Sequence, residues 1–258
     1  MALISFYKYH GAGNDFILLD QRNETQELTK ENIAFLCDRH FGIGADGLMY
    51  LRPPQSPGTH FHMVYFNSDG RESSMCGNGG RCIVQFASHL GIVENEAHFT
   101  AIDGTHWARI NEDATVALGM NDIDGVQILH GGYFLNTGSP HHVEWRAHVG
   151  ENFVQEARDL RHQYGAEGSN INFVHVHNGT LHIRTYERGV EDETLACGTG
   201  CVAAAAVALR EGWLQGTTVP IQALGGTLTV ALQGTGPFTN VVLTGPAQFV
   251  FEGKIEID

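Results

Sequence analysis

Basic residues are scarce in this sequence. Its 258 residues include 15 Lys plus Arg against 29 Asp plus Glu, a formal net charge of −14 with histidine neutral. A protein that binds nucleic acid needs basic side chains to neutralise phosphates, and an anionic membrane surface attracts the same side chains. The shortage therefore argues against both nucleic acid and a membrane as partners.

Long apolar runs are absent as well. The longest extends from Cys201 to Leu209, whereas a helix that spans a bilayer needs about 20 residues. The N-terminus has no basic residues ahead of a long apolar stretch, as a secretory signal peptide would have. The 42% of hydrophobic residues can nevertheless bury a sizeable core. We expect a folded cytoplasmic protein.

Cysteine occurs five times, an odd number, and no Cys-x-x-Cys pair is present. This usage fits neither a disulfide framework nor a structural zinc site, so we expect free thiols and no metal. Cys37, Cys82 and Cys201 are expected to be small core residues. Cys76 and Cys197 stand in a different context.

The sequence contains an internal repeat. Four segments of the first half recur in the same order in the second half, and no Gly/Ser-rich or Pro-rich linker separates the copies. The repeat predicts two halves, residues 1–121 and 122–249, with the tail 250–258 pairing back onto the first half. The matching segments are 11–15 with 136–140, 38–42 with 160–165, 62–66 with 182–186 and 74–79 with 195–200.

Hydrophobic periodicity predicts strands, a helix, more strands and a second helix in each half. The second helix of the second half is apolar nearly all round, which is typical of a buried helix. Each half is therefore expected to be α+β, with β-structure around a central helix. Helices are expected at 29–40 (with Thr29 as N-cap), 79–90, 152–164 and 199–210, and strands at 61–66, 114–119, 227–232 and 240–243.

Cys76 and Cys197 occupy matching places in the two halves, each just before a Gly-x-Gly and the start of an expected helix. Unpaired N–H groups and the helix dipole at such a start bind anions such as a carboxylate and lower the pKa of a thiol. Two thiols on opposite faces of a carbon can remove a proton from one side and return one from the other. The pair therefore predicts inversion of a stereocentre without metal or cofactor.

Longer motifs around these residues resemble the diaminopimelate epimerase family over essentially the whole chain. The resemblance implies two pseudo-symmetric halves, each a β-barrel-like sheet wrapped around a central helix. It also implies a cofactor-independent isomerase, commonly a homodimer, that interconverts LL- and meso-2,6-diaminopimelate in lysine and peptidoglycan precursor biosynthesis. The motifs are His10–Phe16, Phe41–Asp46, Phe66–Gly70, Met75–Arg81, Tyr186–Gly189 and Glu193–Gly200.

The resemblance assigns roles residue by residue. Cys76 and Cys197 match the catalytic thiols, and Glu187 and His141 match residues that contact the reacting amino acid beside them. Arg188 suits the distal carboxylate of the substrate, because a guanidinium pairs with a carboxylate through two hydrogen bonds. The positions that match substrate-binding residues are Asn14, Asn67, Gly77, Asn78, Asn170, Glu187, Arg188, Gly198 and Thr199.

Three positions depart from the family pattern. Ser139 stands where the family often has Asn, and Gly47 stands where it has Gln. The segment Val190–Asp192 makes the loop after Glu-Arg-Gly one residue longer than the commoner form. These departures concern possible substrate contacts at Ser139 and Gly47, and they leave the thiol pair intact.

Two other functions remain open at this point. A racemase or epimerase of proline or hydroxyproline would use the same thiols, but such enzymes usually have His where Asn78 stands, and proline has no distal carboxylate for Arg188. A non-catalytic protein that binds a small molecule on the same fold is the second alternative. Loss of one thiol would be its expected mark, and both thiols are present.

Overall fold

The computed structural model describes residues 2–23 and 27–257, and the chain divides into two compact units. Unit 1 comprises residues 1–118 together with 246–258, and unit 2 comprises residues 119–245. The limits expected from the repeat, 121 and 249, lie a few residues further along the chain.

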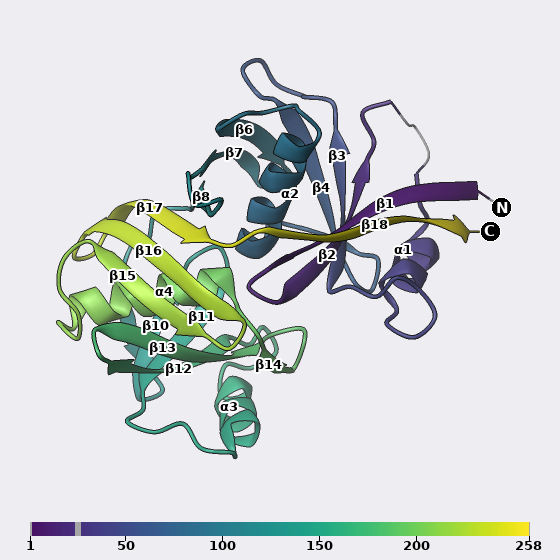
Figure 1. Ribbon diagram of the computed structural model, residues 1–258. Coiled ribbons are helices and arrows are strands. Elements are labelled where there is room, and N and C mark those ends of the chain that lie inside the picture. The colour runs from purple at the N-terminus through teal and green to yellow at the C-terminus, as the bar shows by residue number, and fades with distance from the viewer. Residues whose placement is uncertain (1, 24–26, 258) are drawn as a thin grey trace. The chain divides into compact units, whose positions relative to one another are not determined.

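Unit 1 contains a sheet in which the first and last strands of the chain are neighbours. Its strands pair in the order β18–β1–β2–β3–β4–β6–β7–β8, and β5 pairs with β4. Figure 1 shows β18 in yellow beside β1 in purple. The strands are β1 (Ala2–Gly11), β2 (Asn14–Asp20), β3 (Gly47–Arg52), β4 (Phe61–Asn67), β5 (Glu72–Ser73), β6 (Glu96–Ala101), β7 (Gly104–Ile110), β8 (Val116–Gly119) and β18 (Gln248–Ile257).

Unit 2 repeats this topology step by step. Its strands pair in the order β9–β10–β11–β12–β13–β15–β16–β17, with β14 on β13. The pairs β11–β12 and β13–β15 are parallel, as are β2–β3 and β4–β6 in unit 1. The strands are β9 (Gln127–Leu129), β10 (Gly132–Asn136), β11 (Pro140–Trp145), β12 (Asn170–His177), β13 (Thr180–Glu187), β14 (Asp192–Thr194), β15 (Thr218–Ala223), β16 (Gly226–Gly234) and β17 (Phe238–Gly245).

Each unit holds one central helix against its sheet. In unit 1 this is α2 (Gly77–His89), which contacts β1, β2, β3, β7 and β18; in unit 2 it is α4 (Gly198–Arg210), which contacts β10–β13 and β15–β17. Every residue of α4 from Cys201 to Ala208 is fully buried, as its apolar composition predicts. No helix in the described ranges is both long and apolar enough to cross a membrane.

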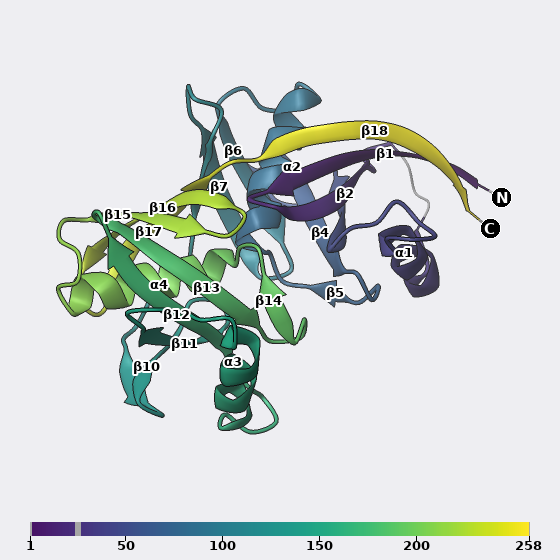
Figure 2. The ribbon, with the colours of Figure 1, turned by 60° about the horizontal axis from the view of Figure 1, so that its bottom comes forward.

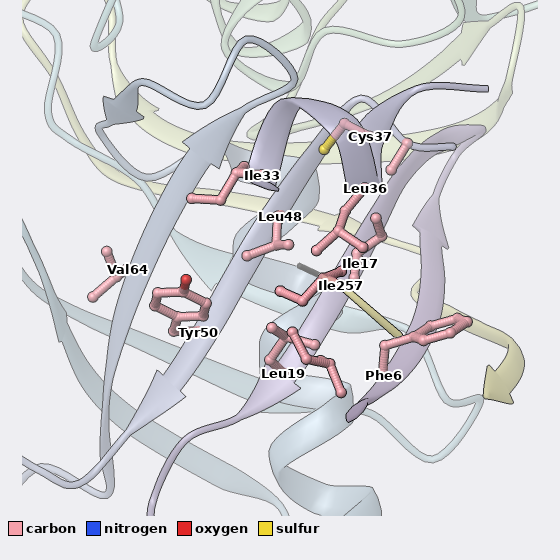
Figure 3. Packing of buried hydrophobic residues seen from close by; sticks show 12 residues of the cluster. Phe6, Ile17, Leu19, Ile33, Leu36, Cys37, Leu48, Tyr50, Val64 and Ile257 are labelled. Carbon is pink, nitrogen blue, oxygen red and sulfur yellow. The ribbon is translucent and has the colours of Figure 1, made fainter. Parts of the chain in front are cut away.

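A second helix covers the other face of the unit 1 sheet. Helix α1 (Lys30–Cys37) begins at the N-cap Thr29, whose side chain accepts from the backbone N–H of Asn32, as expected. Its Ile33 and Leu36 pack on the sheet in the cluster of Figure 3. Because α1 and α2 cover opposite faces, β2 is apolar at consecutive positions rather than alternate ones.

In unit 2, α3 (Phe153–His162) takes the corresponding outer place (Figure 2). Its Phe153 and Leu160 cluster with Ile171 and Phe173 of β12. Because side chains alternate along a strand, Asn170 and Asn172 point to the opposite face, toward α4.

The structure corrects three of the expected boundaries. The helix expected at 29–40 ends at Cys37, because Asp38 leaves helical geometry and its carboxylate accepts the N–H groups of two following residues. The strand expected from residue 114 begins at Val116, because Ala114 lies in a turn with a φ of 63°. Helix α2 begins two residues before the expected start, directly after Cys76.

Candidate active site

In unit 1, Cys76 is the N-cap residue of α2 and is half-buried. Its side chain makes no capping hydrogen bond among the described residues, and the first helical bond runs from Gly80 N to the carbonyl oxygen of Cys76 at 2.7 Å. The N–H groups of Gly77 and Asn78 precede this bond and belong to the first turn, which has no intrahelical acceptors. This helix start has the geometry of an anion cradle beside a thiol.

The Asn14 side chain joins Cys76 to Asn78. Its Oδ1 accepts from Asn78 Nδ2 at 3.1 Å and lies 3.8 Å from Cys76 Sγ. Its Nδ2 donates to Asp46 Oδ2 at 2.6 Å, which fixes the orientation of the amide. Asn67, the remaining candidate of this unit, is exposed at the end of β4, opposite Gly47 in the strand pairing.

A charged network holds Asp46 in place. Arg39 Nη2 lies 2.8 Å from Asp15 Oδ1 and 2.7 Å from Asp46 Oδ1, and the buried Lys8 lies 2.7 Å from Asp15 Oδ2. Burial alone would raise the pKa of Asp15, but hydrogen bonds from Arg39 and Lys8 outweigh it and lower the pKa to about 2. Through Arg39 the network holds the Asp46 side chain where its Oδ2 accepts from the amide of Asn14.

Arg81 supports the helix start from inside the unit. Its guanidinium is fully buried, with Nη1 donating to the carbonyl oxygen of Gly77 at 3.1 Å and Nη2 donating to Asn78 Oδ1 at 2.8 Å. Asn78 Nδ2 is thereby turned toward Asn14. Sequence reasoning assigned no role to Arg81 or Asp46, although both lie inside the motifs of the family, because motif spacing does not report side-chain contacts.

The structure gives a reason for Gly47. A Cβ atom at this position would lie 2.6 Å from the carbonyl oxygen of Phe66 and 2.6 Å from Cε2 of Tyr65. The Tyr65 ring therefore occupies the space that a side chain at position 47 would need.

In unit 2, Cys197 is the N-cap residue of α4 and is 7% exposed. Its Sγ lies 3.4 Å from Thr199 Oγ1. Burial raises the pKa of the Cys197 thiol well above its usual value, and the Glu187 carboxylate raises it further, against the hydrogen bond with Thr199. The lowered pKa expected for this thiol from its helix start is therefore wrong, because burial outweighs the local donors.

His141 is completely buried beside this thiol. Its Nε2 lies 2.9 Å from Ser139 Oγ and 2.9 Å from Thr199 Oγ1, so Thr199 joins His141 to Cys197. Burial, together with the nearby charge of Arg188, lowers the pKa of His141 to about 3. The imidazole is neutral at physiological pH.

Asn170 links this cluster to the loop after β13. Its Nδ2 donates to the carbonyl oxygen of Pro140 at 3.0 Å and to Ser139 Oγ at 3.2 Å, while its Oδ1 accepts from the backbone N–H of Arg188 at 2.8 Å. Ser139, which departs from the family pattern, therefore lies among the candidate residues and hydrogen-bonds with three of them, His141, Asn170 and Thr199.

Glu187 and Arg188 follow directly at the end of β13. The Glu187 carboxylate accepts from Thr194 Oγ1 at 3.0 Å. The Arg188 side chain is exposed and donates to the carbonyl oxygen of Glu167 at 3.0 Å. Unit 2 thus brings Glu187, His141 and Thr199 to the side of Cys197 and leaves the Arg188 guanidinium on the surface.

Comparison with known proteins decides the family. The family profile described as diaminopimelate epimerase matches residues 6–123 and 133–250, one segment for each copy of the repeat. The chain belongs to the diaminopimelate epimerase family. It is 50% identical to a protein named diaminopimelate epimerase from Flavobacterium psychrophilum, over 98% of this chain and 100% of that one. A protein of the same name from Aquifex aeolicus is 36% identical, with 98% of each chain covered.

Solved structures with low sequence identity share the fold. A phenazine biosynthesis protein of the PhzF family from Bacillus anthracis matches with a TM-score of 0.74 at 14% identity, over 100% of both chains. A hydroxyproline epimerase from Agrobacterium vitis matches with a TM-score of 0.68 at 14% identity, over 98% of this chain and 92% of that one. The family, the pseudo-symmetric α+β fold and the isomerase class expected from the sequence are therefore confirmed.

The other cysteines of this epimerase-family chain are core residues. All five are free thiols, and Cys37, Cys82 and Cys201 are at most 4% exposed. Burial raises the pKa of Cys37 and of Cys82 to about 12. Within the described ranges, no group of three or more His, Cys, Asp or Glu side chains is arranged to hold a metal ion.

Proposed function

We propose that this protein interconverts LL- and meso-2,6-diaminopimelate in the cytoplasm, for lysine and peptidoglycan precursor synthesis, without a cofactor. The observation that carries the proposal is the repeated half-site, in which each unit places a cysteine at the N-cap of its buried central helix. The relative of 50% identity named diaminopimelate epimerase supports this substrate.

The proposed reaction is a proton exchange at one α-carbon. The thiolate of one cysteine takes the α-proton and becomes a thiol, while the electron pair of the broken C–H bond moves toward the α-carboxylate. The thiol of the other cysteine gives its proton to the opposite face and becomes a thiolate. Protons and charge balance, and the stereocentre is inverted.

The helix starts supply the stabilisation that this step needs. The α-carboxylate gains enediolate character as the proton leaves, and backbone N–H groups in a water-poor site stabilise that charge. We assign this role to the pairs Gly77–Asn78 and Gly198–Thr199. Both pairs lie in the first turns of their helices. The proposed step balances its protons without a metal ion or an organic electron sink.

The remaining candidates are assigned to binding. Asn14, Asn67 and Asn170 orient the ammonium and carboxylate groups, because amides offer both donors and acceptors. Arg188 pairs with the distal carboxylate. Glu187, which raises the pKa of Cys197, and His141 contact the reacting amino acid, and Glu187 favours the protonated, acid form of that thiol.

The decisive experiment is incubation with LL-diaminopimelate in deuterated water. We expect meso product that carries deuterium at the α-carbon, and loss of both product and deuterium in Cys76→Ala and in Cys197→Ala. Cys37→Ala is the matched control, because it removes a buried thiol at the end of α1 that packs in the hydrophobic cluster of unit 1. Absence of both product and α-deuterium in the unaltered protein would overturn the proposal, and normal turnover by either thiol variant would overturn the two-thiol mechanism.

A substrate panel separates the alternatives. Proline and hydroxyproline lack a distal carboxylate, so we expect no inversion of either. Inversion of proline but not of diaminopimelate would identify a racemase of the other type. Binding of diaminopimelate without deuterium uptake would identify a non-catalytic binding protein.

We further propose that two copies of the chain form a homodimer through β1 and β18. In the described part of the chain β18 pairs with β1 alone, and an unpaired strand edge is a ready template for another chain. Apolar side chains are exposed on these two strands, with Leu3 of β1 at 62%, Val250 of β18 at 49% and Phe251 of β18 at 44% exposure. Light scattering should show a dimer that Phe251→Asp converts to monomer, whereas Ile102→Asp, a change at another exposed apolar residue, leaves it intact. A monomeric unaltered protein would contradict this proposal.

A further inference from the structure

The two half-sites have equivalent backbones but different side chains behind the thiols. The parallel pairs β2–β3 and β11–β12 place Phe16 opposite Gly47 and His141 opposite Asn170. Two residues after Gly47 and Asn170 come Met49 and Asn172. Met49 pairs with Tyr65 of β4, and Asn172 pairs with Thr185 of β13. The corresponding positions are Phe16 with His141, Met49 with Asn172 and Tyr65 with Thr185.

The glycines of the two helix starts confirm this equivalence in space. A Cβ atom at Gly79 would lie 3.2 Å from Met49 Sδ and 3.6 Å from Phe16 Cζ. A Cβ atom at Gly200 would lie 2.6 Å from Asn172 Oδ1 and 3.4 Å from Cys197 Sγ. The same space is therefore filled by apolar side chains in unit 1 and by polar side chains in unit 2. Since unit 1 packs with apolar residues here, the fold does not require the polar ones.

The polar side chains of unit 2 form one directed chain. Thr185 Oγ1 donates to Asn172 Oδ1 at 2.9 Å, and Asn172 Nδ2 donates to the carbonyl oxygen of His142 at 2.9 Å. A carbonyl oxygen can only accept, so the amide has one orientation. The same Nδ2 lies 3.1 Å from His141 Nδ1, which must therefore accept.

The tautomer of His141 follows from this orientation. A neutral imidazole that accepts at Nδ1 carries its proton on Nε2. Nε2 lies 2.9 Å from both Thr199 Oγ1 and Ser139 Oγ, and Ser139 Oγ lies 3.2 Å from Thr199 Oγ1. Thr199 can therefore accept from His141 and direct its own hydroxyl proton to Cys197 Sγ at 3.4 Å. Donation to sulfur favours the thiolate.

We propose that Asn172 and Thr185 are positioning residues that hold His141 in its Nε2–H form, so that the Thr199 hydroxyl donates to the sulfur of Cys197. The proposal rests on the proposed function in treating Cys197 as an acid–base thiol. A buried polar network with every member satisfied is rigid and specific. This relay gives Cys197 a hydrogen-bond donor, and the equivalent positions of unit 1 carry Phe16 and Met49 behind Cys76.

Charged and titratable groups on the neighbouring elements also face the relay. Arg188, after β13, acts on His141, while Glu187 of β13 and Cys201 of α4 act on Cys197. All three stay in place in the variants chosen as tests. A change in the alkylation of Cys197 between these variants is therefore caused by the altered hydrogen bonds of the relay.

The principal test replaces the donor of the relay. In Asn172→Asp the carboxylate can only accept, so it draws the imidazole proton to Nδ1, and Nε2 then competes with sulfur for the Thr199 proton. ¹⁵N spectra of the His141 ring should change from the Nε2–H to the Nδ1–H form. At a fixed pH, alkylation of Cys197, mapped by mass spectrometry, should slow about tenfold for each unit by which its thiol pKa rises. Cys76 in the same sample is the internal standard and should not change.

Asn172→Asp introduces a carboxylate, so a second pair of variants tests the relay without adding a charge. Thr185→Val removes the hydrogen bond to Asn172 Oδ1, one of the two contacts that orient the amide, and should shift the pH profile of Cys197 alkylation upward, whereas Thr185→Ser should restore it. Met49→Leu, at the unit 1 position equivalent to Asn172, is the matched control and should leave Cys197 unchanged.

The outcomes separate the relay from the proposed function, because neither the spectra nor the alkylation uses substrate. An unchanged His141 tautomer in Asn172→Asp together with an unchanged Cys197 profile in Thr185→Val would overturn the relay, even if diaminopimelate is turned over. A shifted profile in a protein that does not epimerise diaminopimelate would overturn the function and leave the relay standing.

Discussion

Burial of a neutral His141 has a measurable consequence for stability. The pKa of this residue falls from 6.5 to about 3 because burial and the charge of Arg188 disfavour the imidazolium. Between these two pH values the unfolded chain binds a proton at this residue that the folded chain does not. The contribution of His141 to the free energy of unfolding is therefore fully present above pH 6.5, and it is lost as the pH decreases toward 3.

The magnitude follows from the size of the pKa difference. Each unit corresponds to about 1.4 kcal/mol, so lowering the pH from about 7.5 to about 4.5 should remove about 2 to 3 kcal/mol through this residue alone. His141→Gln removes the titrating group. The difference in unfolding free energy between the unaltered protein and the variant should therefore shrink by this amount over the same interval.

Urea unfolding at several pH values, followed by tryptophan fluorescence, measures the difference. Trp145 and Trp213 report unit 2, where their rings lie 4.8 Å apart between centroids. His177→Gln, at an exposed histidine of β12, controls for the loss of an imidazole. A difference between unaltered protein and His141→Gln that stays constant within about 0.5 kcal/mol across this range would refute the reasoning.

Three further predictions concern other parts of the chain. Thr29→Ala removes the cap of α1 and should lower the unfolding free energy by about 1 kcal/mol in urea, whereas Thr29→Ser should not. Gly47→Gln, which restores the family's residue, should cost about 1 to 3 kcal/mol; Tyr65→Ala should recover only part of this, because the carbonyl oxygen of Phe66 also lies 2.6 Å from the new Cβ. Hydrogen bonds from Arg39 and Lys8 outweigh the effect of burial and lower the Asp15 pKa from 3.8 to about 2, so its contribution to stability is present above pH 3.8 and is lost toward pH 2. Circular dichroism over this range should show a steeper loss in the unaltered protein than in Asp15→Asn.

Much of the site was accessible to sequence reasoning because its signals are local. A cysteine followed by Gly-x-Gly and an apolar helix predicts a thiol at a helix start wherever it occurs, and its repetition predicts a second one. The boundaries of α2 and α4 agree with this prediction within two residues. The N-cap at Thr29 is equally local, since a cap and its partner lie three residues apart.

What sequence reasoning missed comes from contacts between distant segments. Asp46 lies 32 residues from the Asn14 amide that it orients, and Asn172 lies 31 residues from the His141 ring that it fixes. Arg81 lies in a recognised motif, but only its complete burial shows that it holds Asn78 from inside the unit. Such roles depend on strand register and on burial, which no spacing encodes.

The sequence by itself therefore determined the family, the duplicated α+β plan and the two thiols, because repetition, periodicity and helix starts are written in neighbouring residues. Only the tertiary structure decided the electrostatic state of the site. Burial raises the pKa of Cys197 against the expected effect of its helix start, and it keeps His141 neutral. Desolvation depends on everything that packs around a group, and in unit 2 that packing brings together β11, β12, β13 and α4.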